Sequence, residues 1–240
     1  MKYYTFGFKT FILGRYGSLL IALILLMVMQ PAVDTQLGKY LLEMMFVIVL
    51  FTGLRAIEIK KSLLGFDVLL LLVSLVLNVM GVVTGNEVLF FIGIGCRVLF
   101  MILVALTILI DLFRGRKVSG DTLAGAVCVY LMLAVIWGYL FLLIEVMAPG
   151  SFSFTQGQAR MHLWISREFF PFFYFSLVTI TTVGYGDMSP VTTQAQTFAT
   201  FEAIIGQVYL TILVARLVGM YLVNQQVDNT NSGEETEQQE

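Results

Sequence analysis

The segment from Thr179 to Asp187 holds the residues whose types and spacing best suit chemistry, because it contains the run Thr-Val-Gly-Tyr-Gly. A cation that leaves water needs other oxygen ligands, and consecutive backbone carbonyls supply them when all point to one side. That arrangement requires alternating backbone conformations, some with positive φ, which Gly184 and Gly186 adopt without a Cβ clash. An extended chain advances about 3.3 Å per residue. The run therefore predicts closely spaced cation sites in single file.

The atoms expected to form these sites belong to five consecutive residues. They are Thr182, Val183, Gly184, Tyr185 and Gly186, with carbonyls of the first four stacked along the path and the Thr182 hydroxyl as the innermost oxygen. The side chains of Val183 and Tyr185 are expected to point away from the path and to pack behind it. Asp187 is expected just outside the run.

The composition indicates that a membrane surrounds this run. Of the 240 residues, 58% are hydrophobic and 12% are charged, whereas soluble domains average about 45–50% and roughly 25%. The net charge of −2 argues against a nucleic-acid binder with a basic surface. The composition excludes a soluble enzyme and a disordered scaffold, and it predicts an all-α, polytopic membrane protein that is not an enzyme.

Six stretches are apolar enough to cross a membrane, which takes about 20 residues in a helix. They are residues 18–33, 40–56, 66–83, 88–112, 122–147 and 193–223. A shorter apolar run, 169–180, is too brief to span and fits a re-entrant helix. A cleaved secretory signal over the first stretch is a weaker alternative, because residues 30–33 lack a clear small-x-small cleavage site.

The distribution of basic residues predicts the orientation, since cytoplasmic loops carry an excess of Lys and Arg. Nine basic residues fall in the N-terminal, second-to-third and fourth-to-fifth connecting segments: Lys2, Lys9, Arg15, Arg55, Lys60, Lys61, Arg114, Arg116 and Lys117. Three fall on the opposite side: Lys39, Arg160 and Arg167. Both termini are therefore expected in the cytoplasm, and Asp187 on the outside.

Taken together, these features resemble the potassium channels of the pore-loop superfamily, in which Thr-Val-Gly-Tyr-Gly is the selectivity filter. The likeness is greatest to small prokaryotic members with six helices; it is strong over residues 122–223 and only topological before them. It implies a potassium-selective channel of the cell membrane that conducts passively. Because one chain supplies one filter loop and an ion cage takes about four, it also implies a homotetramer.

The resemblance also implies how the chain is divided and what it binds. Residues 1–112 would form a four-helix transmembrane domain, 113–121 a cytoplasmic linker, 122–223 the pore domain and 224–240 an acidic cytoplasmic tail, expected to be disordered. The implied partners are further copies of the chain, membrane lipids and K⁺, without nucleic acid. No cofactor is implied beyond the permeant K⁺ in the filter.

Further residues take roles from the resemblance. Residues 169–181 would be a pore helix whose C-terminal dipole faces the cation, with Tyr174 hydrogen-bonded to Asp187. Gly206 would be either a gating hinge or a close-packing glycine. The inner cavity and gate would be lined by Gln207, Leu210, Val214 and Val218. Glu202 needs a partner at its depth, either behind the filter or on a neighbouring subunit.

The fourth stretch lacks the basic residues that voltage sensors carry at every third position. The corresponding positions are Ile94, Arg97, Phe100, Leu103 and Leu106. One charge moved through 100 mV contributes about 2.3 kcal/mol, and steep gating takes about 3–4 charges per subunit. We therefore expect weak or no voltage dependence, and we expect Arg97 to form a structural pair with Glu43.

Two other function classes remain open. One is a potassium-uptake transporter subunit with a pore-loop fold, and the other is a membrane scaffold with a vestigial pore. Transporters of that kind usually carry degenerate filters repeated within one chain, whereas the run here is intact and occurs once. The sequence therefore favours the channel.

Overall fold

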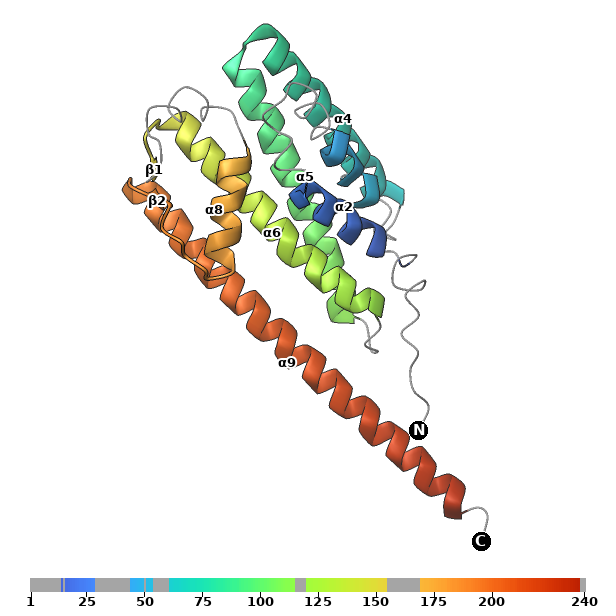
Figure 1. Cartoon of the computed structure of the whole chain (residues 1–240). Coiled ribbons are helices and arrows are strands. Elements are labelled where there is room, and N and C mark those ends of the chain that lie inside the picture. Colours follow the sequence, from blue (N-terminus) through green and yellow to red (C-terminus); the bar gives the residue numbers. More distant parts are fainter. Residues whose placement is uncertain are drawn as a thin grey trace.

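The computed structural model describes residues 14, 16–28, 44–49, 51–53, 61–114, 120–154 and 169–237, most of them helical. The elements are α2 (Gly17–Val28), α4 (Lys61–Thr84), α5 (Glu87–Arg114), α6 (Gly120–Met147), β1 (Phe152–Phe154), α8 (Phe170–Ile180), β2 (Met188–Pro190) and α9 (Thr193–Glu237) (Figure 1). Residues 44–49 and 51–53 are also helical.

Within the described ranges, three helices are long and apolar enough to cross a membrane. They are Val88–Arg114, Gly120–Met147 and Thr193–Gly219, and they coincide with the fourth, fifth and sixth expected spans. The first and second expected spans, and many side chains of the third, lie partly outside the described residues, so the number six stays a prediction. The described residues are mostly helical, and the three long apolar helices are consistent with a helical membrane protein.

The expectation of a disordered tail after residue 223 is wrong. Helix α9 continues without a break to Glu237 and extends well past the other helices (Figure 1). Nucleation is the costly step of helix formation, and propagation adds one hydrogen bond per residue fixed. The apolar part of α9 supplies the nucleus, so the polar residues after it continue the same helix.

The first helices pack on α6 of the same chain. Helix α4 turns back onto α5 at Gly85, whose φ is 66°, and both α5 and α2 contact α6. Just before α2, Tyr16 donates its N–H to Asp121 Oδ1 at 3.0 Å and its hydroxyl to Asp111 Oδ2 at 2.5 Å. Because Asp111 is on α5 and Asp121 on α6, Tyr16 joins three helices at one end of the molecule.

Helix α8 lies between α6 and α9 (Figure 1). The approach to α6 is close, since a Cβ on Gly138 would lie 2.9 Å from Phe173 Cα. On the other side of α6, Trp137 meets Phe198 of α9 edge to face, with centroids 6.2 Å apart. Helix α8 also contacts α9, so it is packed against both long helices.

A two-stranded antiparallel sheet packs beside the first half of α8. Strand β1 pairs with β2 in the register Phe152↔Pro190, Ser153↔Ser189 and Phe154↔Met188. The Phe152 ring packs edge to face on Phe172 and Phe175 of α8. The segment that follows the Thr-Val-Gly-Tyr-Gly run is thereby anchored to the segment that follows α6.

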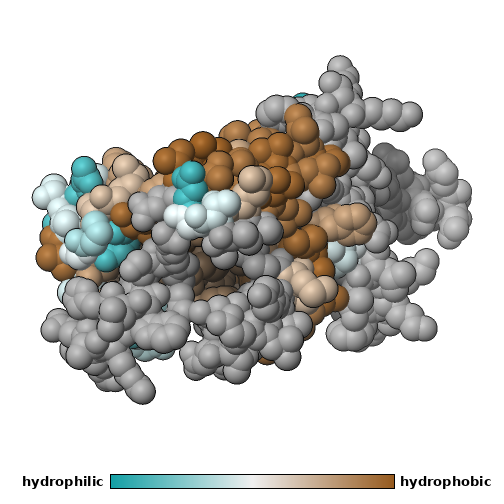
Figure 2. Space-filling model, turned by 90° about the horizontal axis from the view of Figure 1, so that it is seen from above, coloured by the Kyte–Doolittle hydropathy of each residue, from teal (hydrophilic) through white to brown (hydrophobic). Residues whose placement is uncertain are grey.

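The spanning helices differ in how much of their surface one chain covers. In the most apolar stretch of each helix, half of α5 and 61% of α6 is buried within the chain. The corresponding share of α9 is only 11%. Apolar residues cover much of the described surface, and hydrophilic ones gather at the end that carries β1 and β2 (Figure 2). The exposed face of α9 includes Phe201, Ile204, Ile205, Val208 and Ile212.

Candidate functional site

The Thr-Val-Gly-Tyr-Gly run follows directly on α8 and is tied to the last turn of that helix. An α-helix leaves its last four carbonyls without intrahelical partners, and here each of the four has one. Leu177 O accepts from Thr181 N, and Thr179 O accepts from Thr182 N. Val178 O accepts from the N–H groups of Val183 and Gly184, and Ile180 O accepts from the Tyr130 hydroxyl. The end of α8 therefore positions the run.

The backbone of the run alternates in the way that the sequence predicts. Positive φ angles occur at Thr182 (60°), Gly184 (61°) and Gly186 (76°), and not at the residues between them. Glycine adopts such angles freely. For the β-branched Thr182 a positive φ is a strained conformation, and among the described residues it is the only one of its kind outside glycine.

Two carbonyls of the run point away from α8. The N–H groups of Val183 and Gly184 donate to Val178 O at 3.0 and 3.3 Å. In a trans peptide the C=O and N–H groups point in opposite directions, and the described chain contains no cis peptide. The carbonyls of Thr182 and Val183, which share those peptide groups, therefore face the open side of the run.

Within one chain, no described residue covers the side of the run that these carbonyls face. Residues 181–186 are all exposed; Val183 is 51% and Tyr185 70% exposed. The expected packing of these two side chains behind the run is therefore not made within one chain. A Cβ at Gly184 or Gly186 would meet no atom within 4 Å, so backbone conformation, and not crowding, sets the need for glycine there.

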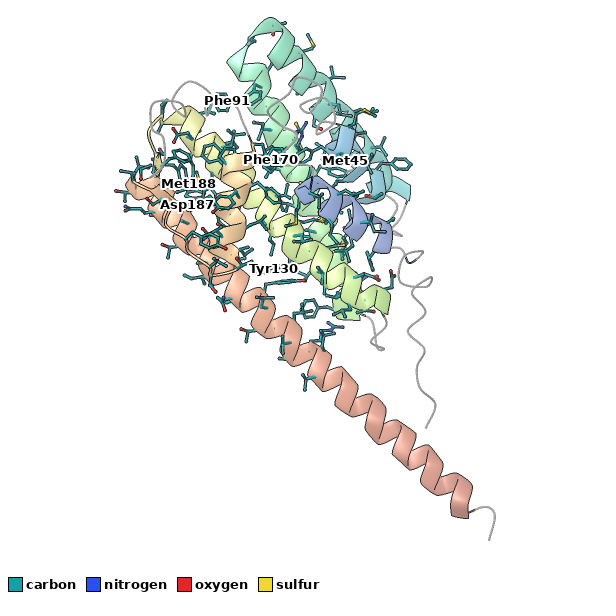
Figure 3. All side chains as sticks on the ribbon, in the orientation of Figure 1. Met45, Phe91, Tyr130, Phe170, Asp187 and Met188 are labelled. Carbon is teal, nitrogen blue, oxygen red and sulfur yellow. The ribbon has the colours of Figure 1, made fainter. Side chains whose placement is uncertain are left out.

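The expected hydrogen bond between Tyr174 and Asp187 is present. The Tyr174 hydroxyl donates to Asp187 Oδ2 at 2.8 Å, while Asp187 Oδ1 accepts the N–H of Met188. This hydrogen bond raises the pKa of Tyr174 from 10.0 to about 12. Asp187 lies beside the first turns of α9, where the run returns toward β2 (Figure 3).

A double-mutant cycle tests the Tyr174–Asp187 contact. Tyr174→Phe removes the donor, and a hydrogen bond to a charged group contributes about 1.5–3 kcal/mol; the half-exposed site places the loss at the low end. We expect Tyr174→Phe and Asp187→Asn each to lower the unfolding temperature, and the double variant to lose less than their sum. The contribution of this hydrogen bond to stability should be complete below pH 10, and it should vanish as the pH rises through the raised pKa of Tyr174, about 12. If the losses of the two single variants add up to the loss of the double variant, the two side chains do not interact.

Gly206 is a close-packing glycine in this structure. A Cβ at this position would lie 2.5 Å from Ile180 Cγ1 and 3.3 Å from Ile180 O. Helix α9 runs through Gly206 without interruption. Of the expected cavity and gate residues further along α9, Gln207, Val214 and Val218 are exposed and Leu210 is half-buried.

Arg97 is buried and contacts α6. Its Nη1 donates to the Tyr139 hydroxyl at 2.8 Å, and its guanidinium lies over the ring of Phe46 at 5.1 Å. Tyr139 in turn stacks on Phe169, at the start of α8, with ring centroids 4.1 Å apart. The expected partner Glu43 lies outside the described residues. Arg97 on α5 is thus linked, through Tyr139 on α6, to Phe169 at the start of α8.

Loss of the Tyr139 hydroxyl should destabilise the protein, because this hydroxyl accepts a hydrogen bond from the buried Arg97. Tyr139→Phe removes a buried acceptor from Arg97, and a hydrogen bond to a charged group is worth about 1.5–3 kcal/mol. We expect a lower unfolding temperature in detergent, with Arg97→Gln and Tyr139→Phe together losing less than the sum of the two. Equal unfolding temperatures for Tyr139→Phe and the unmodified protein would refute the contact.

The structure also adds residues that the sequence did not single out. Tyr130 of α6 donates to Ile180 O at 2.9 Å and stacks with Tyr209 of α9 (Figure 3). Ser176 of α8 is fully buried and hydrogen-bonds Glu202. Ser176 stands among the aromatic residues of α8 and was a usable signal in the sequence. Tyr130 gave no such signal, since tyrosines are common in spanning helices.

Backbone carbonyls are the ligands this site offers. Within the described ranges, no three His, Cys, Asp or Glu side chains come together in a way that suits a metal ion. Cys128 is a buried free thiol and Cys96 a half-buried one. A ligand here would be bound by main-chain oxygens and not by charged side chains.

Comparison with protein families gives one match: residues 126–223 fit the family model described as an ion channel. The matched part begins in α6 and ends in α9, and it includes α8 and the run. Comparison with curated proteins and with solved structures gave no match.

Proposed function

We propose that the chain is a potassium-selective channel. The match of residues 126–223 to the family model described as an ion channel supports an ion-conducting domain in a membrane protein. In this proposal α6 is the outer helix, α8 the pore helix, residues 182–186 the filter and α9 the inner helix. Members of this family conduct ions passively and are not enzymes.

The observation that carries the proposal is the alternation of φ at Thr182, Gly184 and Gly186. It supports a row of carbonyls on the open side of the run, which is what a dehydrated cation requires. Carbonyl rings of this sequence coordinate K⁺ in place of its hydration shell. The attachment of the run to α8 supports a filter that keeps its shape as ions pass.

Four copies of the chain would complete the filter. One chain contributes one oxygen per ring, and the run, with Val183 and Tyr185, lies open on its surface. The largely uncovered apolar face of α9 supports its burial against other copies or lipid. Irregular backbone at membrane depth is tolerated only where protein or a water-filled path surrounds it, and a homotetramer meets that condition.

The gating proposal follows from the charge of α5. Arg97 is the one basic residue among the expected sensor positions, and its contact with Tyr139 supports a structural role. We therefore propose a six-helix subunit in the cell membrane with both termini cytoplasmic and with weak or no voltage dependence. Val214 and Val218 would form the apolar constriction at the inner end of α9.

Flux into liposomes tests the function. Purified protein should admit K⁺, should be blocked by Ba²⁺ and should exclude Na⁺. Equal K⁺ and Na⁺ flux would contradict potassium selectivity. Absence of flux from correctly assembled tetramers would favour a scaffold with a vestigial pore, and flux that requires an accessory subunit would favour an uptake system.

A further inference from the structure

Glu202 and Ser176 form a buried polar contact between α9 and α8. Both side chains have no exposed surface. The Ser176 hydroxyl lies within hydrogen-bonding distance of Glu202 Oε1 and, at 2.8 Å, of the carbonyl oxygen of Ala134 on α6. One serine hydroxyl thus links three helices, four residues before the end of α8 from which the run begins.

The number of protons available at this contact bears on the state of the carboxyl group. A serine hydroxyl has one proton to donate, and a carbonyl oxygen can only accept. If Ser176 donates to Ala134 O, then its contact with Glu202 is a hydrogen bond only when the carboxyl group is the donor. Both contacts are satisfied together when Glu202 carries a proton.

The surroundings of Glu202 agree with a neutral acid. Apart from Glu202 itself, the charged residues in α6, in α8 and in α9 up to Gly219 are Asp121, Glu145 and Arg216. Arg216 is 14 residues further along α9, or about 21 Å at 1.5 Å per residue, and its guanidinium lies over Phe113 at 4.5 Å. No cation in these three helices therefore balances a charge on Glu202.

The neighbouring titratable groups are hydroxyls whose protons are already used. Tyr130 of α6, the titratable group that faces Glu202, donates to Ile180 O. Tyr209, which stacks on Tyr130, donates to Ala126 O at 2.6 Å. Glu202 Oε2 has no hydrogen-bond partner within the described part of the chain. An ionised carboxylate without donors is very costly to bury.

Glu145, the other buried glutamate among the described residues, shows the contrast. Its oxygens accept the backbone N–H groups of Gly150 at 2.8 Å and Phe152 at 3.1 Å. Two backbone donors therefore point at this carboxyl group. Glu202 instead faces a hydroxyl that is engaged with a carbonyl, which suits the protonated form.

We propose that Glu202 is a proton-holding positioning residue that, as a neutral acid donating to Ser176, joins α9 to α8 and so holds the filter in place. The proposal rests on the proposed channel function for its effect on conduction. Its chemical part, a protonated carboxyl group at Glu202, stands without that function.

Infrared spectroscopy of the full-length protein in lipid tests the chemical part. At neutral pH the protein should show the carbonyl band of a protonated carboxylic acid, and Glu202→Gln should remove it. Glu145→Gln, the matched control, should leave that band in place. A Glu202→Gln difference spectrum in which only carboxylate bands are lost would overturn the proposal, whatever the outcome of flux measurements.

Flux measurements test the positioning part. Glutamine has nearly the shape of the neutral acid and also donates, so Glu202→Gln should keep K⁺ flux and selectivity within about twofold, as for substitutions that break no buried interaction. Glu202→Ala and Ser176→Ala should each lower K⁺ flux about tenfold or more, the equivalent of one lost buried hydrogen bond. If Glu202→Gln is as damaging as Glu202→Ala, or if Ser176→Ala and Glu202→Ala conduct normally, the positioning role is wrong.

Discussion

Replacing Gly184 by alanine should abolish selective K⁺ conduction. Gly184 has a φ of 61° in the middle of the run, and an L-residue in this conformation carries roughly 1–3 kcal/mol of strain. At about 1.4 kcal/mol per factor of ten, the conducting backbone would become about tenfold to a hundredfold less populated in each subunit. The peptide would relieve the strain by rotating, which turns its carbonyl away from the ion path.

The matched control for Gly184→Ala is Gly85→Ala. Gly85 has a similar φ of 66°, would also have no atom within 4 Å of an added Cβ, and lies in the turn between α4 and α5. This variant should lose similar stability and keep its K⁺ over Na⁺ preference in liposomes. Equal loss of selectivity in both variants would mean that strain anywhere in the chain, and not carbonyl direction in the run, causes the effect.

Replacing Gly206 by alanine should destabilise the protein and disturb the run at the same time. The new Cβ would lie 2.5 Å from Ile180 Cγ1 and 3.3 Å from Ile180 O. Relief of this overlap moves Ile180, whose carbonyl accepts from Tyr130 and whose next residues begin the run. Overpacking of this kind costs typically about 1–3 kcal/mol. The measurements are the unfolding temperature and the K⁺ flux, both of which should fall.

The same substitution separates close packing from a hinge. If Gly206 served only as a hinge, alanine would stabilise helix α9 by up to about 1 kcal/mol, and the unfolding temperature would rise. Gly95→Ala is the control, because Gly95 is also inside a helix but has no atom within 4 Å of a Cβ. A rise in unfolding temperature in both variants would contradict the packing role.

Hydropathy predicted the long helices well. The expected spans 88–112 and 122–147 differ from α5 and α6 by at most two residues at each end, because a membrane demands uninterrupted apolar length and the flanking charges mark where it stops. The tail was predicted wrongly for the same reason. Polarity tells where a helix leaves the membrane, but a helix that is already formed continues into water.

The conformation of the run was predictable only in part. Gly184 and Gly186 indicate positive φ by their type, whereas Thr182 has it against its own preference, with φ at 60°. Hydrogen bonds impose that angle: the N–H groups on either side of the Thr182 α-carbon turn back to Thr179 O and Val178 O. Such strain depends on the end of α8 and has no signal at the residue itself.

Partners of the buried polar residues were the least predictable. Arg97 bonds Tyr139, 42 residues away, and Glu202 bonds Ser176, 26 residues away. Sequence reasoning recognised that both charged side chains needed partners at membrane depth. Which helix faces supply them depends on how α5, α6, α8 and α9 rotate against one another, and apolar helices leave that rotation unspecified.

The most direct test of potassium selectivity is the reversal potential of single channels in a planar bilayer, with K⁺ on one side and Na⁺ on the other. The proposed carbonyl row at residues 182–185 predicts a reversal potential far from zero, in the direction set by K⁺. The single basic residue among the expected sensor positions of α5 predicts little change in open probability with voltage. A reversal potential near zero would contradict the account, because it would mean that the pore does not distinguish the two cations.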